Sequence, residues 1–148
     1  MKLSYAIPVK DELLEITKLL NFLIKNKDNE DEIVILFDSE NGSKGVEDYL
    51  RAKSVNAPKF AWHSYKFDGH FANMKNHLTS LCSGDWIVQL DADEMIGDQF
   101  IPWVKGSIEA NPEVHAFYGI FPNEEEICIL HHKDIKRQEQ QNNYYNTL

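Results

Sequence analysis

The sequence contains little cysteine and no long hydrophobic run, and each absence excludes a class of protein. Its two cysteines among 148 residues, Cys82 and Cys128, form neither a Cys-x-x-Cys pair nor a disulfide framework. We expect both to be small buried side chains. No run approaches the length of a membrane span, and the amino terminus, interrupted by Pro8, is too short for a signal peptide. The sequence therefore predicts a protein of the reducing cytoplasm without a transmembrane segment.

Basic residues are also scarce. The chain has 15 Lys and Arg against 24 Asp and Glu, which gives a formal net charge of −9. A nucleic-acid-binding protein would present a basic patch or stripe, and binding to anionic lipid would need a polybasic segment. We therefore predict no nucleic-acid partner. A phosphorylated ligand would need a metal ion or a few well-placed cations to offset the repulsion.

Two common nucleotide-binding signatures are missing. No Gly-x-Gly-x-x-Gly follows the first predicted strand and no Walker phosphate loop occurs, which excludes the dinucleotide and P-loop classes. The chain instead alternates apolar strand-like runs with helical patterns, and this alternation predicts one α/β domain with a mostly parallel sheet flanked by helices. We predict strands at 2–8, 33–37, 59–64, 86–90, 114–121 and 127–131, the last two joined as an antiparallel hairpin. We predict helices between Asp11 and Asn26 and at 44–53, 70–82 and 99–110, and the helix at 70–82 would carry Phe71, Met74, Leu78 and Leu81 on one face. Residues 1–135 would form the domain, and residues 136–148 a polar helix or tail.

The most informative stretch is Gly84-Asp85-Trp86-Ile87-Val88-Gln89-Leu90-Asp91-Ala92-Asp93-Glu94. Its mostly apolar part, residues 86–90, is typical of a buried strand, and the acidic residues follow at the carboxyl end of that strand. In an extended segment residues i and i+2 face the same way, so Asp91 and Asp93 could face one point. Crowded carboxylates need compensation, and hard oxygen ligands suit Mg²⁺ or Mn²⁺ shared with substrate phosphates.

Two other interpretations of this acidic motif stay open. Acidic residues can simply end a strand in solvent, since short motifs carry a real false-positive risk. A phosphotransfer enzyme with an aspartyl nucleophile also uses Asp-x-Asp, but that class places it after the first strand and follows it with a hydroxyl residue. Here the motif follows the fourth predicted strand and continues as Glu94-Met95.

The order of these segments resembles the nucleotide-sugar-binding domain of GT-A glycosyltransferases, family 2 in particular. The resemblance runs from about residue 2 to residue 95, and the last two pieces resemble the branch that adds sugars to lipopolysaccharide cores. The matching pieces are Ala6-Ile7-Pro8-Val9-Lys10-Asp11-Glu12, Phe37-Asp38-Ser39, Phe71-Ala72-Asn73-Met74-Lys75-Asn76 before Gly84-Asp85-Trp86, and Leu90-Asp91-Ala92-Asp93-Glu94.

The resemblance implies a role for each matching residue. Pro8 and Val9 would line the nucleotide pocket with backbone, and Asp38 would accept a hydrogen bond from the base, usually uracil. Capping of the turn after the second strand explains Asp38 equally well.

Four further positions carry implied roles. Asp11 would touch the nucleotide, although capping of the first helix explains it more simply. Lys75 stands where the family usually has arginine; it would supply a point charge, or be a solvated helix lysine. Asp91 would face the ribose and the metal's water shell, and Asp93 would bind the Mn²⁺ or Mg²⁺ that bridges the diphosphate.

The implied function is metal-dependent transfer of a sugar, with inversion, from a nucleoside-diphosphate donor, a UDP-sugar favoured, to a hydroxyl of a saccharide or lipid-linked saccharide. The resemblance also implies a carboxylate that acts as general base on that hydroxyl. This general base must lie within hydrogen-bond reach of the hydroxyl, and it stays unassigned. Glu124–Glu126 resemble a solvated turn; Asp134 and the pair His131-His132 are bare candidates. The chain could be a truncated form of such an enzyme. The alternative is a catalytically incomplete nucleotide-sugar-binding module that needs a partner or has lost activity, and a homo-oligomer stays open.

Overall fold

The computed structural model describes residues 1–114, 116–120 and 126–132 of the chain. Strands and helices alternate up to β4, as the sequence predicts, and each predicted element up to residue 131 has a counterpart. The predicted polar helix or tail at residues 136–148 lies outside the described residues. The elements are β1 (Leu3–Val9), α1 (Leu13–Asn26), β2 (Glu32–Asp38), α2 (Lys44–Asn56), β3 (Phe60–Tyr65), α3 (Phe71–Ser80), β4 (Trp86–Gln89), α4 (Phe100–Ala110), β5 (Ala116–Ile120) and β6 (Glu126–His131).

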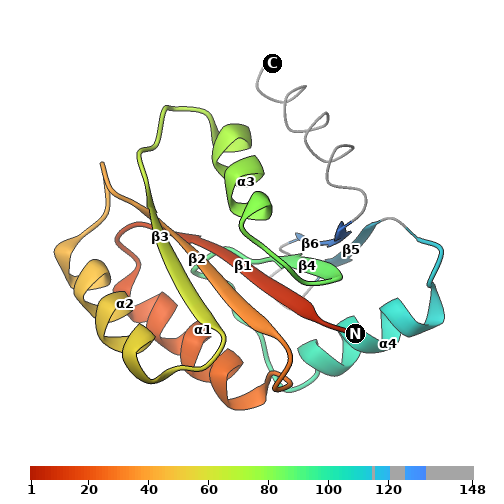
Figure 1. Ribbon diagram of the computed structural model, residues 1–148. Coiled ribbons are helices and arrows are strands. Elements are labelled where there is room, and N and C mark those ends of the chain that lie inside the picture. Colours follow the sequence, from red (N-terminus) through yellow and green to blue (C-terminus); the bar gives the residue numbers. More distant parts are fainter. Residues whose placement is uncertain (115, 121–125, 133–148) are drawn as a thin grey trace.

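The strands form one six-stranded sheet in the order β3-β2-β1-β4-β6-β5 (Figure 1). Strands β3, β2, β1 and β4 are parallel to one another, whereas β6 is antiparallel to β4 and to β5. The predictions of a mostly parallel sheet and of an antiparallel pair near the end are therefore confirmed. Strands β1, β2 and β4 are nearly continuous apolar runs because helices cover both faces of the sheet, whereas the edge strand β3 contains His63 and Ser64 and is partly exposed.

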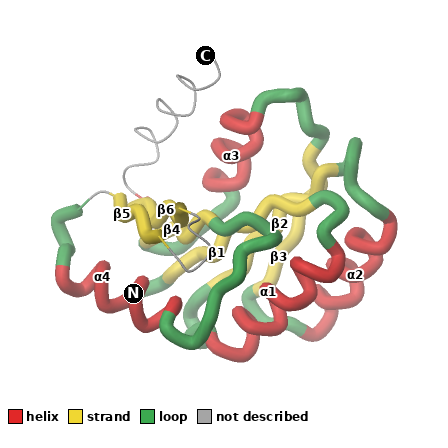
Figure 2. The backbone as a smooth tube through the Cα atoms, turned by 180° about the vertical axis from the view of Figure 1, so that it is seen from behind, coloured by secondary structure: helices red, strands yellow, loops and turns green. Residues whose placement is uncertain are grey.

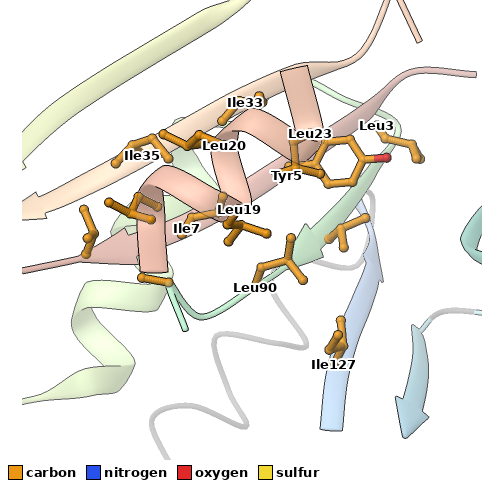
Figure 3. Packing of buried hydrophobic residues seen from close by; sticks show 14 of the residues in the cluster. Leu3, Tyr5, Ile7, Leu19, Leu20, Leu23, Ile33, Ile35, Leu90 and Ile127 are labelled. Atoms are coloured by element: carbon orange, nitrogen blue, oxygen red, sulfur yellow. The ribbon is translucent and has the colours of Figure 1, made fainter. Parts of the chain in front are cut away.

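Helices α1, α2 and α4 cover one face of the sheet, and α3 covers the other (Figure 2). On the first face Leu19, Leu20 and Leu23 of α1 lie against Tyr5 and Ile7 of β1 (Figure 3). The second face holds a smaller cluster. Because side chains alternate along a strand, the odd-numbered residues of β1 pack under α1 while its even-numbered residues face α3. The second cluster comprises Ala6, Val34, Leu36, Met74, Leu78, Cys82 and Ile87.

The strand order reverses at β1, and this position opens a space at the carboxyl ends of the strands. From β1 the chain passes to β2 and β3 on one side, and then returns to place β4 on the other side. Pairing of β1 with β2 continues to Val9 and Phe37, whereas pairing with β4 ends at Ala6 and Gln89. The carboxyl ends of β1 and β4 therefore diverge, and in open α/β sheets ligands bind at such a switch point.

The starts of two helices differ from the prediction. Asp11 does not cap α1: Glu12 is the cap residue, and it makes no side-chain capping bond. The Glu12 carboxylate instead accepts hydrogen bonds from the amides of Lys10 and Asp11, at 3.2 and 3.0 Å. Phe71, predicted on the same face of α3 as Met74 and Leu78, is 66% exposed, whereas those two are buried; it is the first residue of the helix.

The two cysteines have different environments. Cys82 is buried as predicted, and burial is the main reason that the pKa of its thiol rises to about 12. Cys128 is half-buried rather than buried, since it borders a small cavity beside β4. Within the described ranges no helix combines the length and the apolar character needed to cross a bilayer.

Gly84 joins the start of β4 to β1 through a close approach that a side chain would block. Its amide donates to Ser4 Oγ at 2.7 Å. A Cβ atom at this position would lie 2.6 Å from Ser4 Oγ, 2.7 Å from Ser4 N and 2.9 Å from the carbonyl carbon of Leu3. Because two of these neighbours are backbone atoms, the strands would have to move apart to accept it.

We expect Gly84→Ala to lower the free energy of unfolding by about 1–3 kcal/mol, the usual cost of overpacking. Gly106→Ala is the matched control: Gly106 lies within α4 and a Cβ there would meet nothing within 4 Å, so alanine should stabilise by up to about 1 kcal/mol. Urea unfolding of both variants measures the difference. Equal shifts would contradict the proposed close packing at Gly84.

Candidate functional site

A cleft of about 610 Å³ opens at the carboxyl ends of β1, β2 and β4. Every residue predicted to bind the nucleotide or the metal lines it, although these residues come from separate parts of the sequence: Pro8, Val9, Asp11, Asp38, Lys75, Asp91 and Asp93. The other lining residues are Lys10, Glu12, Asn41, Phe67, Phe71, Met74 and Ala92. The sheet topology thus gathers the candidate residues in one place.

The acidic turn after β4 presents alternate residues to the cleft. Asp91 and Asp93 are exposed and line it, whereas Ala92 and Glu94 are only 2% and 8% exposed. The amide of Glu94 donates to the Asp91 carbonyl at 3.1 Å, which closes the turn. Two carboxylates therefore border the same space, although they lie on a turn and not on the extended segment that the prediction assumed.

The donor set fits a metal ion that is shared with a ligand. Within the described ranges no three His, Cys, Asp or Glu side chains are grouped closely enough to hold an ion by themselves. Mg²⁺ and the chemically similar Mn²⁺ typically take one or two carboxylates and complete their coordination with waters and substrate phosphates. Asp91 and Asp93 could supply the carboxylates, and the open cleft beside them leaves room for a diphosphate.

Asp38 caps the turn after β2 and also lines the cleft. It is 8% exposed, and its Oδ1 atom accepts hydrogen bonds from the amides of Glu40 and Asn41, both at 3.0 Å. Its Oδ2 atom accepts from Asn41 Nδ2 at 3.0 Å. The carboxylate therefore closes the turn after β2 and is held rigidly at the wall of the cleft. Since each carboxylate oxygen has two lone pairs, Oδ2 can still accept a further donor.

The loop from β1 to α1 lines the cleft between Asp38, which ends β2, and the turn with Asp91 and Asp93 after β4. Asp11 is exposed in the cleft and its carbonyl accepts from the Leu13 amide at 3.0 Å. Burial raises the pKa of the neighbouring Glu12, and Asp11 raises it further, against the lowering effect of the amides of residues 10 and 11. Glu12 therefore holds the loop, which leaves Asp11 as the acid that faces the cleft.

The wall formed by α3 and the segment before it carries apolar side chains and one cation. Phe67 and Phe71 lie with ring centroids 5.0 Å apart, and Met74 is buried beneath them. Lys75 is half-buried, and no ion pair of Lys75 is found in the part of the chain that the structure describes. Its ammonium group is thus available to a negatively charged ligand in a cleft that Lys10 and several acidic residues also line.

The histidine pair lies away from this cleft. His131 pairs with Trp86 at the amino end of β4, and His132 Nδ1 donates to the Gly84 carbonyl at 2.7 Å. The prediction that His131-His132 could supply a ligand or base for this site is therefore wrong, because β6 runs antiparallel to β4 and carries the pair to the opposite edge. Glu124, Glu125 and Asp134 lie outside the described residues, and Glu126 begins β6.

Sequence reasoning assigned no role to several residues that line the cleft. Lys10, Glu12 and Ala92 are adjacent in sequence to residues predicted for the site, and this adjacency could have identified them. Asn41 lies in the polar turn after β2. Phe67 stands between β3 and α3 and has no motif that marks it; the contact with Phe71 places it in the site.

The comparisons with known proteins agree with this geometry. The sequence profile described as Glycosyl transferase family 2 matches residues 4–147. An uncharacterized glycosyltransferase of Mycoplasma genitalium, MG060, is 27% identical over 111 residues, which span 68% of this chain and 35% of that protein.

Solved structures share the fold at low sequence identity. TarS from S. aureus (residues 1-349) superposes with a TM-score of 0.72 at 16% identity, over 94% of this chain and 49% of that one. Structures of TarS contain UDP or UDP-GlcNAc. The mannosyltransferase PcManGT from Pyrobaculum calidifontis, in complex with GDP-Man and Mn²⁺, gives 0.73 at 16% identity, over 91% of this chain and 46% of that one. The chain thus spans between a third and a half of these relatives.

Proposed function

This chain belongs to glycosyl transferase family 2, and we propose that its cleft binds a nucleoside-diphosphate sugar and transfers the sugar to an acceptor hydroxyl. A UDP-sugar is the favoured donor, the reaction inverts the anomeric centre, and the acceptor is a saccharide or a lipid-linked saccharide. The observation that carries the proposal is that all residues predicted for the donor site line one cleft at the switch point of the sheet.

The two ends of the cleft suit the two ends of a nucleotide diphosphate. Asp38 and the aromatic pair of Phe67 and Phe71 form the β2–β3 end, where a fixed carboxylate can accept from a base and a ring can stack on it. Asp91 and Asp93 form the β4 end, and Lys75 lies on the α3 wall. The base would therefore bind near β2 and the diphosphate near β4.

The metal would be held by Asp91 and Asp93. When bound, a divalent ion neutralises charge on the departing nucleoside diphosphate. Lys75 adds a second positive charge from the opposite wall, and the rigid turn of Asp38 orients the nucleoside. The protein's contribution is thus chiefly positioning and electrostatic stabilisation. Complexes of the structural relatives with UDP, UDP-GlcNAc, and GDP-Man with Mn²⁺ support this choice of ligands.

A donor-binding module without transfer activity is the second candidate. Within the described residues no carboxylate that follows Asp93 lines the larger cleft. The general base expected on the acceptor side is therefore not identified, and binding without turnover would satisfy all the observed geometry.

Nucleotide binding tests the proposal directly. UDP at about a hundred times its dissociation constant should stabilise the protein by roughly 2.7 kcal/mol, which is a rise in Tm of roughly 5–10 °C at this size. We expect this rise with UDP and Mn²⁺, a smaller one with GDP or ADP, and little without the metal. Asp93→Asn should remove the metal-dependent part.

Asp98→Asn is the matched control, since Asp98 is exposed five residues further along and does not line the cleft. It should bind UDP as the wild type does. No rise in Tm with any nucleotide, in protein shown to be folded, would refute the donor site. An equal loss in both variants would refute the role of Asp93.

A further inference from the structure

A second, smaller cavity lies behind the acidic turn. It has a volume of about 60 Å³ and shares Pro8, Lys75 and Asp91 with the larger cleft. Its remaining lining residues come from β1, α3, the end of β4 and β6: Ala6, Leu78, Gln89, Leu90, Glu94 and Cys128. We call this cavity the side pocket. It adjoins the proposed diphosphate position on the face of the sheet that α3 covers.

The side pocket contains an unsatisfied hydrogen-bond donor. Gln89 is the last residue of β4, and its Nε2 atom is buried and has no hydrogen-bond partner. A buried amide without a partner is costly, and proteins generally pair such groups. Gln89 adjoins the metal-site residues in sequence, so a ligand that reaches Asp91 is close to this donor.

A buried carboxylate borders the same space. Glu94 is 8% exposed and lines the side pocket, on the opposite side of the turn from Asp93. An alcohol can donate to a carboxylate and accept from an amide at the same time. A fully ionised phosphate group has no hydrogen with which to donate in this way. The side pocket therefore suits a hydroxyl group.

The volume limits what can enter. A cavity of about 150 Å³ is needed to hold one benzene ring, so the side pocket of about 60 Å³ has room for a hydroxyl-bearing arm and not for a whole sugar ring. The ring itself would remain in the larger cleft.

We propose that the side pocket binds one hydroxyl-bearing arm of the donor sugar, through Gln89 Nε2 and the Glu94 carboxylate, and so selects which sugar is bound. This inference rests on the proposed function, in which Asp91 and Asp93 hold the diphosphate. It adds a sugar-selecting role for Gln89 and Glu94, which would act on the sugar and leave the binding of UDP itself unchanged.

The test compares UDP with UDP-sugars in wild type and Gln89→Met, which keeps the side-chain length and removes the donor. Dissociation constants with Mn²⁺ would be measured for UDP, UDP-glucose, UDP-galactose, UDP-N-acetylglucosamine and UDP-xylose. We expect the preferred UDP-sugar to bind about three- to tenfold more weakly, the worth of one neutral hydrogen bond. UDP should be unaffected within about twofold, and the Tm of the unliganded variant should not fall through the removal of Nε2, because this atom has no partner to lose.

Gln89→Leu provides a second variant in case methionine packs poorly. Gln99→Met is the control, since Gln99 is exposed and outside both cavities. For each UDP-sugar, the ratio of its dissociation constant to that of UDP is compared with the wild-type ratio. If both Gln89 variants keep the wild-type ratio for every UDP-sugar, the side pocket holds solvent and the inference is wrong. An equal loss for UDP and UDP-sugars would also overturn it. Failure of wild type to bind UDP would instead refute the proposed function on which it rests.

Discussion

Asp93→Asn should slow the release of UDP from a UDP-sugar by at least about a hundredfold, the scale of loss seen when one stabilising group at a developing charge is removed. Asparagine keeps the shape of the side chain but carries no charge, so it is a weaker ligand for a hard cation. The effect should appear in the turnover number at saturating donor and Mn²⁺. Water can serve as acceptor, so hydrolysis of UDP-sugars measures this without knowledge of the natural acceptor.

The same assay separates the enzyme from the binding module. Asp98→Asn has the same change of charge on an exposed residue outside the cleft, and it should hydrolyse the donor at the wild-type rate. A wild-type protein that binds UDP but releases none from any UDP-sugar would favour the module. A turnover in Asp93→Asn within threefold of wild type would exclude the proposed charge role of this carboxylate.

The position of the site could be predicted because it follows from the topology. Runs such as residues 33–37 and 86–90 are apolar on both faces, and this pattern requires a sheet covered by helices on both sides. Parallel strands bring their carboxyl ends to one edge, so residues that follow different strands meet there. Pro8, Asp38 and Asp91 are distant in sequence and line one cleft for this reason.

The details that could not be predicted depend on contacts between elements. Local reasoning gave Asp11 the capping role, but Glu12 binds the loop amides instead, and only the folded loop distinguishes two neighbouring acids. Helical spacing placed Phe71 on the same face of α3 as Met74 and Leu78, but Phe71 is the first residue of the helix and is exposed. The side pocket depends on where β1 and β4 diverge, so the unpaired amide of Gln89 has no sequence signature.

The acidic turn is held at both ends, by β4 before it and by α4 after it. Helix α4 is attached to the loop between α1 and β2 through Lys105, whose ammonium forms ion pairs with Asp28 and, at 3.2 Å, with Asp31. Asp31 is fully buried, and its Oδ1 atom also accepts from the Leu3 amide at 2.9 Å. Lys105 therefore neutralises a buried charge in addition to joining two elements.

We expect Lys105→Met to lower the free energy of unfolding by about 3–5 kcal/mol, because removal of one partner leaves the Asp31 carboxylate buried without its cation. Lys44→Met is the matched control: Lys44 pairs with Asp48 on the surface of α2, with side chains 85% and 56% exposed, and such pairs contribute about 0.5 kcal/mol or less. Urea unfolding near neutral pH measures both. A loss below about 1 kcal/mol for Lys105→Met would show that the amides alone satisfy Asp31.

The dependence on pH gives an independent check on the same ion pair. Partial burial disfavours the charged form of Lys105, but its hydrogen bonds to Asp28 and Asp31 outweigh this and raise its pKa above the usual 10.5. The pKa of Lys105 is higher in the folded state than in the unfolded state. The ion pair therefore stabilises the fold fully at pH values below the pKa of the unfolded lysine, and this stabilisation is lost as the pH rises through the pKa of the folded state. The difference in stability between wild type and Lys105→Met should therefore be constant near neutral pH and shrink above about pH 10.5. A difference that stays constant through this range would mean that Lys105 stabilises α4 through its hydrocarbon chain and that its charge contributes little.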